Sequence, residues 1–303
     1  MNPGTIETLA LALPHGITLS CRAAGAPGAP LLVFLHGFPE GAFVWDELLA
    51  HFAPRYRCIA PNLRGFERSS SPAEVEAYRA KHLVADIRAL IAAQGGRAAA
   101  LVAHDWGGAV AWSLAALHPE LLERLVIVNS PHPATFLREL RDNPAQQAAS
   151  AYMNFLCRPD AQALLAADDF ARLWPFFELM GASDASRAGG SWLTESVRER
   201  YRAVWRHGLT GACNYYRASP LRPPTGPDDA IHTLQLPAAM VTVRVPTHVV
   251  WAEADIALPP ALLDGLEAFV PRLTLTRVPG ATHWIVHERP ALVAAEIERA
   301  LAA

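Results

Sequence analysis

The feature that most constrains the fold is a short turn about a third of the way along the chain. An apolar run over residues 98–102 predicts a buried strand, and a helical pattern follows over 108–116. Between them, in Ala103-His104-Asp105-Trp106-Gly107, small residues flank Asp105 on both sides. A strand–turn–helix of this kind holds one side chain exposed on a tight turn, and here that side chain is a carboxylate.

A carboxylate at this position predicts a particular chemistry. A serine there would attack carbonyl carbon, whereas an aspartate can displace a leaving group at a saturated carbon and form an alkyl-enzyme ester. Asp105 therefore points away from esterases and peptidases, and towards cleavage of a C–O or C–halogen bond. A helix N-cap is the alternative role for an aspartate after a strand, so the prediction depends on partners elsewhere in the chain.

Composition excludes several classes of protein. The 303 residues are 51% hydrophobic and 18% charged, which is typical of a globular chain. A net charge of −3 with no basic stripe gives no support for nucleic acid as a partner. The chain has no apolar run of about 18 residues and no signal-peptide pattern, so we expect a cytoplasmic protein without a membrane span. The four cysteines form no CxxC, which predicts reduced thiols without disulfides or a cysteine-bound zinc.

The order of the patterned segments predicts an α/β fold. Expected strands occupy residues 8–13, 17–22, 31–35, 57–60, 98–102, 125–128, 247–251 and 273–278. Expected helices between them occupy residues 77–94, 108–116, 260–269 and 290–301. Strands that alternate with helices imply a mostly parallel sheet covered on both faces.

The alternation of strands and helices is interrupted in the middle of the chain. Residues 131–236 show helical patterns (146–156, 161–167 and 193–205) and a Pro-rich loop over 219–227, but no convincing strand. We therefore predict a core of residues 1–130 and 237–303, with a helical cap of residues 131–236 inserted after the sixth core strand. Such an insertion would lie over the carboxyl ends of the strands, where open α/β sheets bind ligands.

Two further polar residues follow strands at the same edge of the predicted sheet. His283 follows the last strand, and it is the candidate base that activates water against an ester. Asp255 lies on the loop after residues 247–251, and it is the candidate acid that orients this imidazole. The order nucleophile, acid, histidine is that of α/β-hydrolases. A turn aspartate and a surface imidazole are the alternatives.

Two backbone N–H groups are candidates for an anion pocket. Phe38 belongs to His36-Gly37-Phe38-Pro39, which ends the strand over 31–35, and Trp106 follows Asp105 directly. Their N–H groups would orient the carboxylate first and stabilise a tetrahedral intermediate later. The alternative is an ordinary Gly-Pro turn.

The leaving group separates an epoxide from a halide. An epoxide leaves as an alkoxide, which needs a proton, whereas a halide needs only N–H donors. Three tyrosines of the insertion, Tyr152, Tyr215 and Tyr216, are candidate acids. These residues alone do not rank Tyr152 above Tyr201, and packing is the alternative role for each.

The motifs together resemble those of one family. His36-Gly37-Phe38-Pro39-Glu40 and His104-Asp105-Trp106-Gly107-Gly108 resemble the HGFPE and HDWGG motifs of epoxide hydrolases of the α/β-hydrolase fold. Residues 252–255 are similar to the acid loop of that family, and 283–284 to its histidine loop, so the similarity extends over nearly the whole chain. The resemblance implies the same three catalytic residues and requires no metal or organic cofactor.

The insertion carries the more specific part of the resemblance. Tyr152 opens a segment spaced to Pro159 as in the first tyrosine motif of the family. Asn214-Tyr215-Tyr216-Arg217 resembles the second motif, in which the tyrosine before arginine is the acid, and this selects Tyr216 over Tyr215. Two positions depart from the family: Tyr215 stands where tryptophan is frequent, and Glu67 where glycine is usual.

The sequence therefore predicts an epoxide hydrolase that converts a small apolar epoxide into a vicinal diol. A haloalkane dehalogenase with the same nucleophile is the first alternative, although Phe38 offers only its backbone where that family usually has a halide-binding side chain. Trp106 stands where fluoroacetate dehalogenases usually carry arginine. A non-catalytic, ligand-binding member of the fold is the second alternative. A homodimer is compatible with the sequence.

Overall fold

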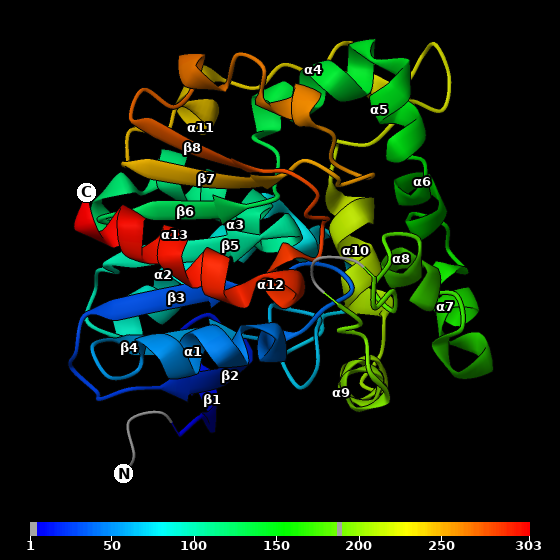
Figure 1. Ribbon diagram of the computed structural model, residues 1–303. Helices are drawn as coiled ribbons and strands as arrows, with labels where there is room; N and C mark the ends of the chain where they lie inside the picture. The colour runs from blue at the N-terminus through cyan, green and yellow to red at the C-terminus, as the bar shows by residue number, and fades with distance from the viewer. Residues whose placement is uncertain (1–4, 187–189) are drawn as a thin grey trace.

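The computed structural model describes residues 5–186 and 190–303, whose strands form one eight-stranded sheet with helices on both faces (Figure 1). The strands are β1 (Glu7–Ala12), β2 (Thr18–Ala24), β3 (Leu31–Leu35), β4 (Arg57–Pro61), β5 (Ala100–His104), β6 (Leu125–Val128), β7 (Thr247–Ala252) and β8 (Leu273–Val278). Their order is β1-β2-β4-β3-β5-β6-β7-β8. The pairs β1–β2 and β2–β4 are antiparallel, and all others are parallel. The predicted fold class, an α/β-hydrolase fold with a mostly parallel sheet, is confirmed.

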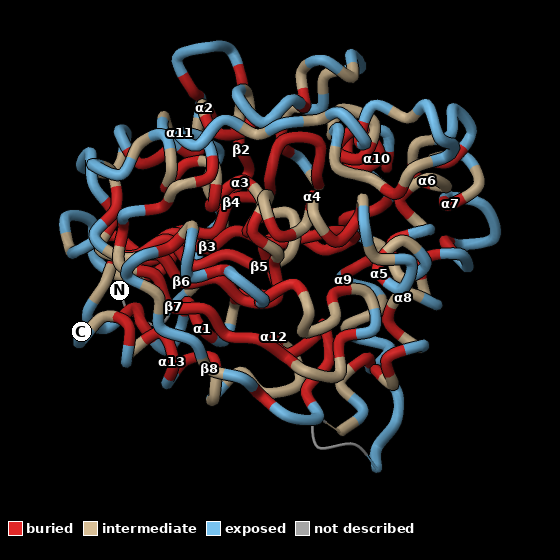
Figure 2. Tube along the Cα trace, turned by 90° about the horizontal axis from the view of Figure 1, so that it is seen from above, coloured by how far each residue is buried: buried red, intermediate tan, exposed pale blue. Residues whose placement is uncertain are grey.

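Helices on both faces explain why the central strands are continuous apolar runs. Every residue of β3, β5 and β6 is buried, because neither face of the sheet meets water (Figure 2). On one face lie α1 (Asp46–Phe52), α12 (Ile285–Glu288) and α13 (Pro290–Ala302); on the other lie α2 (Ala80–Ala93), α3 (Asp105–Leu117) and α11 (Ala238–Val241). Short 3-10 helices occupy Ala42–Trp45 (η1), Val75–Tyr78 (η2) and Pro119–Leu121 (η3).

The described residues between β6 and β7 contain helices and no strand. These helices are α4 (Pro133–Asp142), α5 (Pro144–Ala149), α6 (Tyr152–Leu156), α7 (Ala161–Phe170), α8 (Trp174–Glu178), α9 (Glu195–Trp205), α10 (Thr210–Ala218), η4 (Ala230–His232) and α11. In Figure 1, α6 to α10 lie beyond one end of the sheet. The insertion is therefore placed across the ends of strands, and it does not extend the sheet.

Close backbone packing attaches α10 to the core. Gly211 of α10 meets Gly65, in the loop after β4, so closely that a Cβ at either residue would collide with the backbone of the other. The Tyr215 hydroxyl donates a hydrogen bond to the Arg64 carbonyl (2.9 Å) in the same loop. Residues Gly211–Tyr216 are all buried as a result, and the side chains of α10 are held against the core.

Two expected helices differ from the structure. Residues 260–269 form not one helix but two 3-10 turns, η5 (Pro260–Leu263) and η6 (Leu266–Ala268), because Gly265 between them has φ +74°. The expected helix over 146–156 is likewise divided into α5 and α6. Ser150 lies at the break with φ −95° and ψ 5°, and the Ala151 N–H after it donates to the Ala148 carbonyl (3.2 Å) rather than to the residue four positions back.

Within the residues that the structure describes, no helix has the length and apolar character needed to cross a membrane. All four cysteines are free thiols, and three of them are buried.

Candidate active site

Asp105 lies at the junction of β5 and α3, in a backbone conformation that few residues adopt. Its φ of +48° falls in the left-handed region, which costs most side chains about 1–2 kcal/mol but suits aspartate better than most. The turn also requires its glycines: a Cβ on Gly107 would collide with the Leu35 carbonyl, and one on Gly37 with the Asp105 side chain. The Ser130 hydroxyl donates to the Asp105 carbonyl at 2.7 Å and fixes the turn from the end of β6.

One oxygen of the Asp105 carboxylate is already held by the backbone. The Phe38 N–H donates to Asp105 Oδ1 at 2.7 Å, which leaves Oδ2 available. The structure therefore brings one of the two expected anion-pocket donors to the carboxylate. The Trp106 N–H as second donor stays a prediction; the Trp106 ring packs edge-on against Tyr216, with centroids 5.1 Å apart.

His283 bridges the two carboxylates that the sequence singled out. Its Nδ1 lies 2.7 Å from Asp255 Oδ2, and its Nε2 lies 3.9 Å from Asp105 Oδ2. The loops after β5, β7 and β8 thus place Asp105, Asp255 and His283 together at the carboxyl edge of the sheet. Glu253, two residues before Asp255, instead pairs with Arg277.

Asp255 is held as an anion by an extensive set of donors. Its Oδ1 accepts from the N–H groups of Ala257 (2.8 Å) and Leu258 (2.9 Å), and its Oδ2 also accepts from the Asn129 amide (2.9 Å). Burial alone would raise the pKa of Asp255, but His283 and these donors hold that pKa below its usual value. An ionised Asp255 fixes the tautomer and orientation of His283.

The charges around His283 determine its protonation in the resting protein. Burial lowers the pKa of this imidazole, but the opposing effects of Asp255, Asp105 and Glu40 prevail and raise the pKa from 6.5 to about 9. This raised pKa favours the cationic form of His283 in the resting protein. Any reaction that neutralises Asp105 removes one cause of the raised pKa.

Two tyrosines of the insertion share a cavity of about 220 Å³ with Asp105. Tyr152 begins α6 and Tyr216 lies on α10, with ring centroids 6.1 Å apart. Burial raises the pKa of both phenols, and the Asp105 charge acts in the same direction. Both side chains therefore stay protonated and able to donate at neutral pH.

The hydroxyls of the other candidate tyrosines have partners elsewhere. The Tyr215 ring lines the same cavity, but its hydroxyl donates to the Arg64 carbonyl. The Tyr201 hydroxyl donates to Glu40 Oε1 (3.0 Å) and lies 2.8 Å from His287 Nε2. The structure thus separates Tyr152 from Tyr201, which sequence reasoning alone could not do.

Sequence reasoning assigned no role to several polar groups beside the site. Glu40 is buried against His104, whose Nδ1 is 3.1 Å from Glu40 Oε2 and whose Nε2 is 2.9 Å from the His283 carbonyl. Asn129 and Ser130 were also missed. The available signal was position, since both follow β6, which lies between β5 and β7 in the sheet.

Glu67, the second departure from the family pattern, has φ +49°, a conformation that favours glycine. Its carboxylate accepts from the Asn62 amide (3.1 Å) and from the Arg68 N–H (2.9 Å), which stabilises the turn that a glycine would form without strain.

Comparisons with known proteins identify the family of this chain. The family model described as alpha/beta hydrolase fold matches residues 30–290. An AB hydrolase superfamily protein of Bacillus subtilis is 35% identical over 92% of either chain. Epoxide hydrolase 4 of Mus musculus is 31% identical over 92% of this chain and 74% of its own.

Solved structures of epoxide hydrolases are similar to this chain over nearly its whole length. One, from metagenomes of hot environments, is 38% identical, has a TM-score of 0.86 and covers 99% of both chains. Another, a Bacillus megaterium epoxide hydrolase with an inhibitor bound, is 29% identical with a TM-score of 0.87, over 97% of this chain and 100% of its own.

Proposed function

We propose that this chain, which belongs to the epoxide hydrolases of the alpha/beta hydrolase fold family, converts an apolar epoxide into a vicinal diol through an ester on Asp105. The observation that carries the proposal is the placement of two protonated phenols, Tyr152 and Tyr216, in the same cavity as Asp105. Alkoxide leaving groups need such donors, whereas halides do not. Asp105 is the only charged residue that lines this cavity among the described residues.

In the first half-reaction, Asp105 opens the ring. Oδ1 is occupied by the Phe38 N–H, so Oδ2 attacks one epoxide carbon from the side opposite the C–O bond. The C–O bond breaks, an alkyl ester forms, and the electron pair goes to the epoxide oxygen. Tyr152 and Tyr216 hydrogen-bond that oxygen, and one of them donates its proton to the alkoxide.

In the second half-reaction, His283 activates water. Ester formation removes the negative charge of Asp105, which is one of the charges that raise the pKa of His283. The imidazole therefore loses its proton more readily in the ester than in the resting enzyme, and more of it is in the neutral form that can accept a proton from water. The imidazolium returns a proton to the tyrosinate left by ring opening, and neutral His283 then takes a proton from water as the water oxygen bonds to the ester carbonyl carbon, with the oxyanion stabilised by the N–H groups of Phe38 and Trp106. The bond between that carbon and the alkyl oxygen breaks, the His283 proton goes to the alkyl oxygen, and the diol leaves. The proton of the resulting Asp105 carboxyl group goes back to His283.

The insertion acts as a cap in this scheme. Residues 131–236 supply both phenols, and residues 1–130 and 237–303 supply the nucleophile, acid and base. Hydrogen bonds from Arg138 of α4 to the carbonyls of Ala261 (3.3 Å) and Asp264 (2.8 Å) support a fixed position of the cap on the core.

A direct comparison of an epoxide and a bromoalkane of the same carbon chain tests the proposal. We expect diol from the epoxide and no bromide release, with no loss of activity after dialysis against a chelator, since no step uses a metal. The Asp105→Asn variant controls for background hydrolysis. Bromide release faster than diol formation would favour the haloalkane dehalogenase instead.

A further inference from the structure

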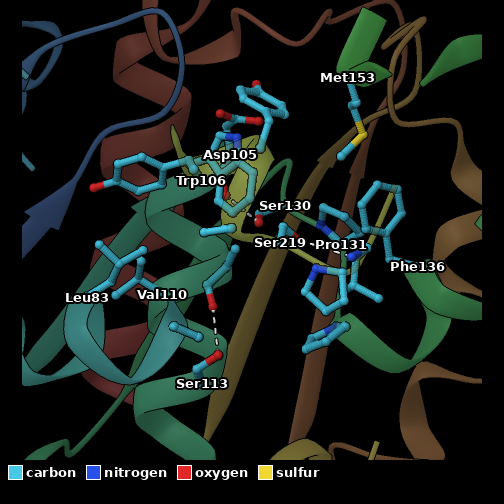
Figure 3. A pocket seen from close by; sticks show the side chains of 18 of the residues that line it. Leu83, Asp105, Trp106, Val110, Ser113, Ser130, Pro131, Phe136, Met153 and Ser219 are labelled. Carbon is cyan, nitrogen blue, oxygen red and sulfur yellow. Dashed lines mark hydrogen bonds between the residues drawn. The ribbon is translucent and has the colours of Figure 1, made fainter. Parts of the chain in front are cut away.

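The cavity at Asp105 is elongated in one direction. Among its lining residues, Asp105, Ala109, Val110 and Ser113 lie on one face of α3, and the last is eight positions after the first. At a rise of 1.5 Å per residue, this face runs for about 12 Å along the helix axis. Figure 3 shows Asp105 and Trp106 at one end of the cavity and Ser113 at the other.

The wall opposite α3 is apolar. It includes Pro131 and Phe136, which lie across the cavity from Val110 in Figure 3. Beyond Asp105, no charged side chain of the described residues lines this cavity. The cavity therefore suits an uncharged, apolar substituent and offers no partner to an ionised one.

The cavity is open to solvent. Ala80 at the start of α2 and Pro220 after α10 both line the cavity and are exposed, and the Met240 side chain of α11 is 43% exposed. The cavity is therefore not a closed chamber that limits the length of a substituent.

The near end, by contrast, is filled by aromatic rings. Phe38 packs edge-on against Tyr216 (centroids 5.2 Å apart) and against Phe176 (5.7 Å). Phe176 in turn packs edge-on against Tyr152 at 5.6 Å. Phe38 and Phe176 lie outside the cavity lining, behind the two tyrosines that would hold the epoxide oxygen. A second large substituent on the epoxide would meet these packed rings.

From this asymmetry we infer that the enzyme takes epoxides with one elongated apolar substituent and discriminates against epoxides with large groups on both carbons. The inference rests on the proposed function, because it places the reacting carbon at Asp105. The uncharged tail lies along α3, and the unsubstituted side of the ring faces Phe38 and Phe176.

Two isomeric substrates test whether the shape of the substrate, and not its hydrophobicity, determines the rate. The epoxides 1,2-epoxyoctane and trans-4,5-epoxyoctane have the same atoms, but the first carries one long tail and the second two short ones. The measured quantity is the single-turnover rate of ester formation on Asp105, followed by mass spectrometry. We expect 1,2-epoxyoctane to react about tenfold faster or more, the usual size of discrimination by an apolar pocket.

Variants at either end of the cavity test which part of it discriminates between the substrates. Ser113→Leu fills the far part and should slow 1,2-epoxyoctane about tenfold while leaving the short 1,2-epoxybutane near the parent rate. Ser113→Ala is its control, since it removes the hydroxyl without filling space. Phe176→Ala should open the near end and raise the rate with trans-4,5-epoxyoctane. Phe155→Ala, on a ring outside both the lining and the four packed rings, should not.

The outcomes distinguish the inference from the proposed function. Equal or faster reaction of the trans isomer, or equal slowing of the short and long substrates by Ser113→Leu, would overturn the inference and leave the chemistry of Asp105 intact. Absence of any ester on Asp105 with either isomer would instead overturn the proposed function.

Discussion

The two halves of the site are built in different ways. Asp105 is the first residue of α3, directly after β5; Asp255 and His283 are on the loops after β7 and β8, and backbone N–H groups hold both carboxylates. The tyrosines come from short helices of the insertion, the five-residue α6 and the nine-residue α10. Strand order alone brings the first group together, whereas the second depends on how the insertion packs. Under the proposed mechanism, the core supplies the nucleophile and the base, and the insertion supplies the donors to the leaving group.

The largest loss of activity should come from a substitution in the core half of the site. Asp105→Asn should abolish turnover without loss of the fold, because the amide is a poor nucleophile of nearly the same shape and its oxygen can still accept from the Phe38 N–H. Diol formation and the thermal unfolding midpoint are measured on fresh protein, and intact mass excludes deamidation back to aspartate. Full activity in sequence-verified protein would remove Asp105 from the nucleophile role.

Substitutions in the insertion half of the site should slow ester formation by degrees. Tyr152→Phe or Tyr216→Phe should slow ester formation by about 10²-fold, since two donors share the alkoxide, and the double variant should be slower still. Tyr215→Phe is the matched control. It should leave this rate near that of the parent and cost only about 1 kcal/mol of stability, through loss of the hydrogen bond to the Arg64 carbonyl.

The rate to follow is single-turnover alkylation, because ester hydrolysis can limit steady-state diol formation. If the double variant forms the ester at the parent rate, the two tyrosines are packing residues. The proposed role of the insertion, to donate to the leaving group, is then wrong.

The smallest expected effect is a change in the pKa of His283, whose imidazole lies between the two carboxylates of the core. His283 has a pKa raised from 6.5 to about 9, partly by the Asp105 charge, so Asp105→Asn should lower this pKa. NMR titration of the His283 imidazole measures it in both proteins. A pKa that stays the same or rises in the variant would show that the Asp105 charge does not act on His283.

The sign of the pH effect on stability follows from the same shift. Because the folded-state pKa of His283 is raised, its contribution to stability is fully present below pH 6.5 and is lost as the pH rises through about 9. Asp105→Asn should move that loss to lower pH, which thermal unfolding at a series of pH values measures.

The sequence allowed much of the core to be predicted, for a physical reason. Strands such as β6 and β8 have the predicted bounds, because short apolar or alternating segments between turn residues have few other solutions. The placement of Asp105, Asp255 and His283 at one edge followed from parallel pairing alone. The supporting Asn129 was missed, because its role depends on a contact with Asp255 across 126 positions of sequence.

The insertion was less predictable, because its helices are short and their ends depend on tertiary contacts. The break at Ser150 and the turn at Gly265 in the core both divided segments that were expected to be single helices. Composition could not separate Tyr152 from Tyr201. The separation required the resemblance to known motifs first, and then the hydrogen bond of Tyr201 to Glu40.

A covalent intermediate on Asp105 is the most direct test of the account. In His283→Gln the core should still form the ester, since Asp105, the Phe38 N–H and both tyrosines remain, but water should no longer be activated. After incubation with 1,2-epoxyoctane, mass spectrometry should find the mass of the epoxide added to the peptide that contains Asp105, and it should persist. An adduct on another residue, or steady diol formation by this variant, would contradict the account.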